Sequence, residues 1–123
     1  MRQMLFVAIA WIAFLSSAAA QDAVTVDPKH YKVEFENDQV RVLRLTYGPH
    51  EKSVMHEHPP HLAVFLTDTH VRFTRPDGKT VDAEPKARST QWSRGGKHLP
   101  ENLDDKPFEV IVVEVKQKPA GTK

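Results

Sequence analysis

The sequence contains no cysteine. This absence excludes disulfide bonds, thiolate nucleophiles, zinc sites with cysteine ligands and the blue-copper centre, which needs a cysteine beside two histidines. Any metal that the chain binds must therefore be held by nitrogen and oxygen ligands. Seven histidines are present, so nitrogen donors for such a site are available.

The chain also lacks a block of charge of one sign. Acidic and basic residues are scattered along it, and their numbers become equal once Arg2 is removed with the other residues of 1–20. Nucleic acids and anionic membrane surfaces are bound through clustered basic residues. We therefore expect neither of them as a partner.

Long hydrophobic runs are absent except at the N-terminus. Residues 4–15 are apolar, Arg2 precedes them, and residues 16–20 are small, in the Ala-x-Ala pattern that signal peptidase recognises. The apolar run is shorter than the roughly 20 residues of a membrane-spanning helix, which argues against an uncleaved anchor. We predict a signal peptide over residues 1–20, cleavage after Ala20, and a periplasmic or secreted protein.

The rest of the chain is long enough for one compact domain with a modest core. Segments rich in Val, Leu, Phe and Tyr, with partial alternation against charged residues, predict strands at 31–36, 39–47, 62–67, 71–75 and 108–115. Turn signals separate them, and the strongest is the Pro-Asp-Gly run at 76–78. Many short strands joined by such turns predict an all-β sandwich or barrel of roughly 8 to 10 strands.

The predicted domain is flanked by two segments without a strand pattern. Residues 21–30 contain Pro28 and are predicted to form an extended lead-in. The barrel is predicted over residues 31–116. Residues 117–123, with a proline and a glycine near the end, are predicted to form a flexible tail.

Two histidines one residue apart, His56 and His58, form the first half of a candidate metal site. Alternate side chains of a strand point to the same face, so both imidazoles would point to one spot. Pro59 and Pro60 restrict the chain direction directly afterwards. The pair alone is weak evidence, because an exposed strand with two outward histidines would have the same sequence.

The second half of the candidate site surrounds His98. Gly95 and Gly96 precede it and permit a tight bend into a strand, and Asn102 would share its face of that strand. A second strand could thus bring His98 opposite the first histidine pair. The other three histidines stand beside charged or turn residues and are predicted to be solvated at the surface: His30, His50 and His70.

The two halves together resemble the two motifs of the cupin superfamily. The first motif runs from a glycine through five residues and His-x-His to a glutamate and a second glycine. Here seven residues separate Gly48 from His56-Glu57-His58, and Asp68 stands in the place of the second glycine. The second motif ends in Gly-x-x-His-x-x-x-Asn, which residues 95–102 match. The resemblance covers roughly residues 31–116 and implies a cupin-type jelly-roll β-barrel, or double-stranded β-helix, with a metal near its centre.

The resemblance implies that His56, His58 and His98 hold a divalent transition metal ion, which could be Fe, Mn, Ni, Cu or Zn. No carboxylate stands at the usual spacing of the family's glutamate ligand, and His61 is nearest to that place. Two alternatives are open for His61, a fourth ligand or a histidine at the rim of the site.

Three further residues near His98 are candidates for the site. Trp92 is expected either to form a wall of the substrate pocket or to pack in the core. Glu101 and Asn102 are expected to orient His98 through hydrogen bonds, with a structural turn contact as the alternative for Asn102. Strand alternation predicts that Glu57 points away from the metal site.

The resemblance implies a metal-dependent enzyme that acts on a small molecule, with a dioxygenase as the first expectation. The fold does not determine the reaction. A second hypothesis is a non-enzymatic module that holds a metal or a small ligand, because no clear acid or base stands beside the histidines. A third is a metal-free cupin that serves as an association surface, since small cupins pair into homodimers through edge strands.

Overall fold

The computed structural model describes residues 21–118. The predicted signal peptide, residues 1–20, lies outside the described residues, as does most of the predicted tail, residues 119–123. No helix within the described part is long and apolar enough to cross a membrane.

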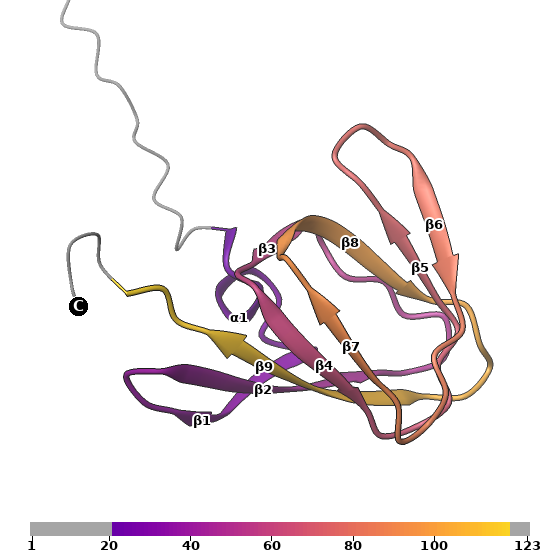
Figure 1. The fold of residues 1–123 in the computed structure, drawn as a ribbon. Helices are drawn as coiled ribbons and strands as arrows, with labels where there is room; N and C mark the ends of the chain where they lie inside the picture. The colour runs from indigo at the N-terminus through magenta and orange to yellow at the C-terminus, as the bar shows by residue number, and fades with distance from the viewer. Residues whose placement is uncertain (1–20, 119–123) are drawn as a thin grey trace, which may run out of the picture.

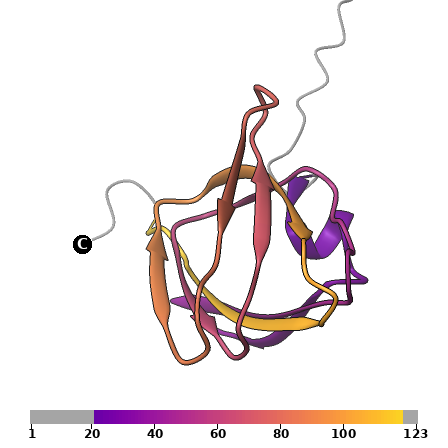
Figure 2. The ribbon, with the colours of Figure 1, turned by 90° about the vertical axis from the view of Figure 1, so that its right-hand side faces the viewer.

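Nine strands in two antiparallel sheets form the described part (Figure 1). The five-stranded sheet has the order β1 (Tyr31–Glu36), β2 (Val40–Tyr47), β9 (Phe108–Val115), β4 (His61–Phe65) and β7 (Thr90–Ser93). The four-stranded sheet has the order β3 (His56–His58), β8 (Gly96–Asn102), β5 (Val71–Thr74) and β6 (Thr80–Ala83). Figure 2 shows the two sheets surrounding the interior, with the β5–β6 hairpin projecting beyond it. The predicted all-β jelly roll is confirmed.

The five strands predicted from residue patterns are all present; two have the predicted ends, and the ends of the other three differ by at most two residues. The predicted hairpin is present as well, formed by β5 and β6. Gly78 lies in its turn with φ 84°, the positive value predicted for it. In that turn the amide of Gly78 donates to the carbonyl of Arg75 at 2.9 Å.

The extended lead-in predicted over residues 21–30 is wrong in part. Residues Ala23–Val26 form a single helical turn, α1, which packs against the barrel through Ala23, a fully buried residue. The burial of Ala23 shows tertiary packing overriding the strand preference of the neighbouring β-branched residues.

The core is built from alternate residues of the long central strands. Along β9, buried and half-buried residues alternate over the whole strand, as the two-residue period of a strand requires. The buried hydrophobic members of β2 and β9 are Leu43, Leu45, Tyr47, Phe108, Val110 and Val112. Their side chains point toward the four-stranded sheet, and the histidines lie at one end of this core.

Candidate metal centre

The pairing of β3 with β8 unites the two halves of the site that the sequence predicts. His56 is paired with His98 and His58 with Gly96 in the antiparallel ladder. Gly95 lies next to this ladder with φ 86°, and a Cβ atom there would lie 2.5 Å from the carbonyl oxygen of His58. Glycine is therefore required at this position. The positive φ of Gly95 and Gly96 agrees with the bend predicted before His98, and the close approach to His58 is a second reason for glycine that the sequence did not indicate.

The three histidines converge on one point in the interior. One ring nitrogen from each of His56, His58 and His98 lies within 4.8 Å of the other two. The rings stand nearly perpendicular to one another, with centroids 4.8 to 5.2 Å apart. His56 and His58 are buried and His98 is half-buried.

Hydrogen bonds set the proton positions on two of the rings. The Nδ1 atom of His56 donates to the carbonyl of Val54 at 2.8 Å, and the Nδ1 atom of His58 donates to Glu114 at 2.8 Å. In the neutral rings both Nε2 atoms therefore carry a lone pair, yet they face each other at 3.1 Å. Two facing lone pairs repel each other, and a metal ion bound by both nitrogens would remove that repulsion.

The third histidine has the same need. The Nε2 atom of His98 is buried and has no hydrogen-bond partner among the described residues. Buried polar atoms without a partner are rare in folded proteins, because each costs about 1–3 kcal/mol of desolvation. The three residues thus fit a metal ion with nitrogen ligands.

Burial keeps these rings in the form that binds metals. Desolvation lowers the pKa of His98 to about 2 and that of His56 to about 4, and the other imidazoles lower both further. Burial alone would raise the pKa of Glu114, but the hydrogen bonds from His58 and Arg41 outweigh it, so this pKa is lowered. Near neutral pH the centre therefore combines the neutral imidazoles of His56 and His98 with the buried carboxylate of Glu114.

His61 lies beside the three converging histidines. It is buried on β4, its ring centroid lies 5.2 Å from that of His58, and its Nδ1 atom donates to the carbonyl of Pro59 at 2.9 Å. It does not belong to the group of converging nitrogens among the described residues. In this structure His61 forms a wall of the adjoining cavity.

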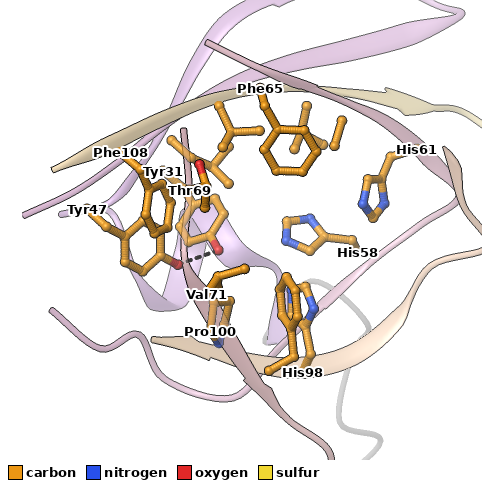
Figure 3. Close-up of a pocket in the computed structure, with 15 residues that line it drawn as sticks. Tyr31, Tyr47, His58, His61, Phe65, Thr69, Val71, His98, Pro100 and Phe108 are labelled. Atoms are coloured by element: carbon orange, nitrogen blue, oxygen red, sulfur yellow. Dashed lines mark hydrogen bonds between the residues drawn. The ribbon is translucent and has the colours of Figure 1, made fainter. Parts of the chain in front are cut away.

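A cavity of about 70 Å³ extends from the histidines into the barrel (Figure 3). His58, His61 and His98 lie at one end, and the hydroxyls of Tyr31 and Tyr47, 2.6 Å apart, lie at the other. The remaining lining residues are mostly apolar: Leu45, Ala63, Phe65, Thr69, Val71, Phe73, Pro100, Phe108, Val110 and Val112. The space exceeds the 10–15 Å³ or so that one water molecule needs, so a small ligand fits.

One candidate residue lies outside both of the places predicted for it. Trp92 is 56% exposed on β7, whereas its neighbours Gln91 and Ser93 point to the interior side and line a hollow beside His61. Trp92 therefore forms neither a pocket wall nor core. Side chains alternate between the two faces of a strand, so the inward direction of Gln91 and Ser93 places Trp92 on the outer face.

The two residues predicted to orient His98 do not contact it through hydrogen bonds in the described part. Asn102 is fully buried, and its amide donates to the carbonyls of Gly48 and Lys106, each at 2.9 Å. This is the structural turn contact given as the alternative for Asn102. Glu101 lies on the other side of β8 and forms a backbone bridge with Lys52.

One histidine predicted at the surface is buried. His30 is 5% exposed, and its two ring nitrogens lie 2.7 Å from Asp27 and 2.8 Å from Glu51. Its ring stacks on Tyr47, with centroids 4.3 Å apart. Neighbouring charges in the sequence suggested solvent, but these carboxylates fold over the ring instead.

Sequence reasoning missed the carboxylate beside His58. Glu114 is 2% exposed, and besides accepting from His58 it accepts from the Nε atom of Arg41 at 2.7 Å. The two residues are direct partners across β2 and β9. The signal was present in the strand period, because Glu114 continues the inward series Val110 and Val112.

Comparison with known proteins gives the class of the fold. No protein-family model and no curated protein matches the sequence. A cupin domain from Bordetella pertussis Tohama I is similar in structure, with a TM-score of 0.66, 21% identity, and coverage of 71% of this chain and 92% of that chain. An RmlC-like cupin family protein with a double-stranded β-helix fold from Methanocaldococcus jannaschii has a TM-score of 0.55 and 17% identity over 72% of this chain and 83% of that chain.

The polyketide cyclase RemF from Streptomyces resistomycificus is a third similar structure, with a TM-score of 0.53 and 17% identity over 72% of this chain and 66% of that chain. Identities this low show the fold alone. The chain has the cupin jelly-roll fold, as its motifs predicted, and that fold carries a cluster of three histidines that could hold a metal ion.

Proposed function

We propose that the protein binds a divalent transition metal ion, Fe, Mn, Ni, Cu or Zn, through His56, His58 and His98, and acts as a metal-dependent enzyme on a small molecule. The observation that carries the proposal is the pair of facing Nε2 atoms of His56 and His58 at 3.1 Å, in two rings whose Nδ1 atoms each lie 2.8 Å from an acceptor. The unpartnered Nε2 atom of His98 supports it.

A bound ion of this kind would supply Lewis-acid or redox chemistry, with coordination positions left open by three protein ligands. The chain's own residues orient the ligands and shape the space beside them. Glu114 holds the ring of His58 by its Nδ1 proton. The apolar walls of the cavity exclude bulk water from the reacting groups.

The cavity favours a small and largely apolar substrate with a polar group at each end. One end would meet the histidines, and the other would meet the hydroxyls of Tyr31, Tyr47 and Thr69. A dioxygenase-like reaction is our first proposal, because three neutral ligands and a dry cavity leave room for both substrate and oxygen. The cyclase among the similar structures supports an enzymatic use of this fold.

A non-enzymatic binding module is the second candidate. Among the described residues that line the cavity, there is no carboxylate and no lysine, so His61 and the hydroxyl groups are the acid–base groups present. Elemental mass spectrometry of the untagged protein, followed by oxygen-uptake assays with small aromatic and aliphatic acids, separates the two. Bound metal with turnover supports the enzyme, bound metal without turnover supports the module, and no metal after reconstitution contradicts both.

We propose that residues 1–20 are removed during export and that the protein works in the periplasm or outside the cell. The apolar run at 4–15 and the small residues at 16–20 support this. Intact-mass and N-terminal sequencing of the protein from a periplasmic fraction should give Gln21 as the first residue. An uncleaved chain in the membrane fraction would contradict the proposal.

We further propose that two copies pair through the outer face of the five-stranded sheet. An apolar row crosses all five strands in register on this face: Phe35, Val42, Val113, Leu62 and Trp92. The residues at its two ends, Phe35 and Trp92, are 54% and 56% exposed. The three residues between them are half-buried, so the row is an apolar strip that is exposed at both ends, and exposed apolar surface is typical of interaction sites.

A second copy suits this face by charge and by size. Arg44 with Glu34 and Glu109 on one flank, and Lys116 with Glu36 on the other, place both signs of charge on each side of the row. Five strands of four to eight residues, about 4.8 Å apart, present roughly 500 Å². Two copies would together bury about 1,000 Å², which is the lower limit for a specific interface.

A further inference from the structure

Two aspartates bound the single helical turn α1, and each is connected to a different metal-ligand candidate. Asp22 lies directly before the turn and Asp27 directly after it. Neither belongs to the cavity or to the cluster of three histidines. Both reach that cluster through one or two intervening side chains.

The first connection runs from Asp22 to His58. The carboxylate of Asp22 accepts from both terminal nitrogens of Arg41, in the two-pronged arrangement typical of a guanidinium and a carboxylate. The Nε atom of Arg41 donates to one oxygen of Glu114 at 2.7 Å, and the other oxygen accepts from His58 at 2.8 Å. Because Arg41 occupies one oxygen, the other remains directed at the ring of His58.

The second connection runs from Asp27 to His56. One oxygen of Asp27 accepts from the hydroxyl of Ser53 at 2.5 Å, and that hydroxyl oxygen lies 3.3 Å from the Nδ1 atom of His56. Asp27 and Ser53 are each 8% exposed. On its other side the same oxygen of Asp27 accepts from His30 at 2.7 Å, so the carboxylate is held between two donors.

Such contacts matter more for a metal centre than for folding alone. A buried arginine–carboxylate pair is often no more stabilising than apolar side chains of similar volume. A carboxylate or hydroxyl on the far nitrogen of an imidazole, however, fixes the tautomer and the ring orientation that a metal requires. The first connection ends in this way at the Nδ1 atom of His58, and the second ends at the Nδ1 atom of His56, where the hydroxyl of Ser53 at 3.3 Å adds to the shorter bond with the carbonyl of Val54 at 2.8 Å.

We infer that the segment Asp22–Asp27 is a positioning element for the metal centre, in which Asp22 acts on His58 through Arg41 and Glu114, and Asp27 acts on His56 through Ser53. The inference rests on the proposed metal binding. It assigns a role to the residues directly after the predicted cleavage site, which the sequence patterns left as a connecting segment.

Metal affinity of the purified chain tests the inference. Asp22→Asn and Asp27→Asn should each weaken Co²⁺ binding, measured by competition with a chromogenic chelator, by about 10–100-fold. Asp38→Asn, in an exposed turn between β1 and β2, is the matched control and should bind like the wild type. Asp22→Glu keeps the carboxylate and should restore most of the affinity. Unchanged affinity in both asparagine variants would overturn the inference.

Double variants separate the two connections. Asp22→Asn combined with Glu114→Gln should lose less than the product of the single effects, because both act on His58. Asp22→Asn combined with Asp27→Asn should lose the full product, because they act on different rings. Independent effects of Asp22 and Glu114 would contradict the first connection.

Side-chain ¹⁵N NMR of the metal-free protein gives a readout that does not need a metal. His56 and His58 should both carry the proton on Nδ1 in the wild type, and Asp27→Asn and Asp22→Asn should each broaden or shift the tautomer signal of one ring only. If circular dichroism shows that Asp22→Asn does not fold, Arg41→Lys takes its place. Lysine keeps the positive charge but cannot form the two-pronged contact with Asp22.

These readouts distinguish the failure of each proposal. A wild type that binds no metal would contradict the proposed function, and the tautomer signals would still decide the inference. Metal binding with tautomers and affinities insensitive to Asp22 and Asp27 would contradict the inference alone.

Discussion

His56 and His98 are direct partners across the antiparallel ladder of β3 and β8, and their rings meet edge to face with centroids 4.9 Å apart. This register is what assembles the site, because a slip of one residue would turn His98 to the opposite face of its strand. The backbone at Gly95 lies close to the backbone of His58 and Pro59, and this close approach holds the register of β3 and β8.

Replacing Gly95 by alanine should therefore damage the metal centre as well as the fold. The new Cβ atom would lie 2.5 Å from the carbonyl oxygen of His58 and 2.7 Å from the carbonyl carbon of Pro59, and both are backbone atoms that cannot move aside cheaply. We expect a loss of about 1–3 kcal/mol in the free energy of unfolding and a clear loss of Co²⁺ affinity.

Gly78→Ala is the matched control for this variant. Gly78 also has a positive φ, 84°, but nothing lies within 4 Å of its Cβ position. It should therefore lose stability through backbone strain alone and keep the wild-type metal affinity. Chemical denaturation and metal titration of both variants check this, and equal metal affinities in the two would contradict the role assigned to the close approach.

The strands and the two halves of the site could be predicted because they depend on local rules. The two-residue period predicted that His56 and His58 share a face, and the glycines before His98 indicated a bend. The same period also carried the missed information. Arg41 and Glu114 both fall at inward positions of strands that are otherwise apolar inside, so a pair of opposite buried charges could have been read from β2 and β9.

Other features depend on contacts between distant segments and could not be predicted from local pattern. His30 is buried because Asp27 and Glu51 come together around it, and the two acidic residues belong to different loops. The helical turn at Ala23 forms because that residue packs against the barrel. Neither contact produces a residue pattern with the period of a strand or helix, so the sequence alone does not reveal it.

Removing His98 should abolish metal binding while the barrel remains folded. His98→Ala deletes one of three nitrogen ligands, and we expect the metal affinity to fall by about 100-fold or more, beyond the effect typical of an orienting partner. His50→Ala is the control, because the side chain of His50 is 60% exposed and pairs with Asp105 at the surface. Metal content by elemental mass spectrometry measures both, and retained stoichiometric metal in His98→Ala would rule out the proposed ligand set.

The metal-free protein should lose stability as the pH falls below about 6.5. Burial lowers the pKa of His56 to about 4 and that of His98 to about 2, from an ordinary value of 6.5. Below pH 6.5 the unfolded chain therefore takes up protons that the folded chain does not, and the free energy of unfolding decreases by up to about 1.4 kcal/mol per pH unit for each ring.

Urea denaturation at pH values from 8 to 5 measures this dependence. Over this range the carboxylates stay ionised, so the histidines dominate the change. His98→Gln removes one titrating ring and should make the dependence shallower by about one proton. A wild-type free energy of unfolding that stays constant between pH 7 and pH 5 would show that the rings are not held neutral.

Filling the cavity should separate ligand access from metal binding. Ala63 lines the cavity between His61 and Phe65, and Ala63→Leu would occupy part of the roughly 70 Å³ at a cost in stability of about 1–3 kcal/mol. Xenon is a suitable probe, because it enters dry apolar cavities. We expect ¹²⁹Xe NMR to show binding to the wild type and not to Ala63→Leu, while Co²⁺ affinity stays the same.

Val64→Leu controls for the added bulk on the same strand, because Val64 is not among the residues that line the cavity. It should bind xenon like the wild type. Xenon binding that survives in Ala63→Leu would place the accessible space elsewhere in the protein and would contradict the substrate site proposed beside the histidines.

A charge in the middle of the outer apolar row should separate the proposed dimer into monomers. Val113 is the central member of the row, paired with Val42 on one side and Leu62 on the other, so the charge of Val113→Lys would lie at the centre of the interface without a partner. Thr80→Lys, on exposed β6 of the other sheet, is the control and should leave the dimer intact.

Sedimentation velocity at several concentrations measures the mass, and Trp92 provides a second signal. It is the only tryptophan outside residues 1–20, so in the mature chain its emission reports the row directly. If the row is the interface, the emission should shift to the blue with rising concentration in the wild type and in Thr80→Lys, and it should not shift in Val113→Lys. A wild type that sediments as a monomer with concentration-independent emission would contradict the proposed pairing, and a dimer that persists in Val113→Lys would place the interface on another surface, such as the free edge of β1.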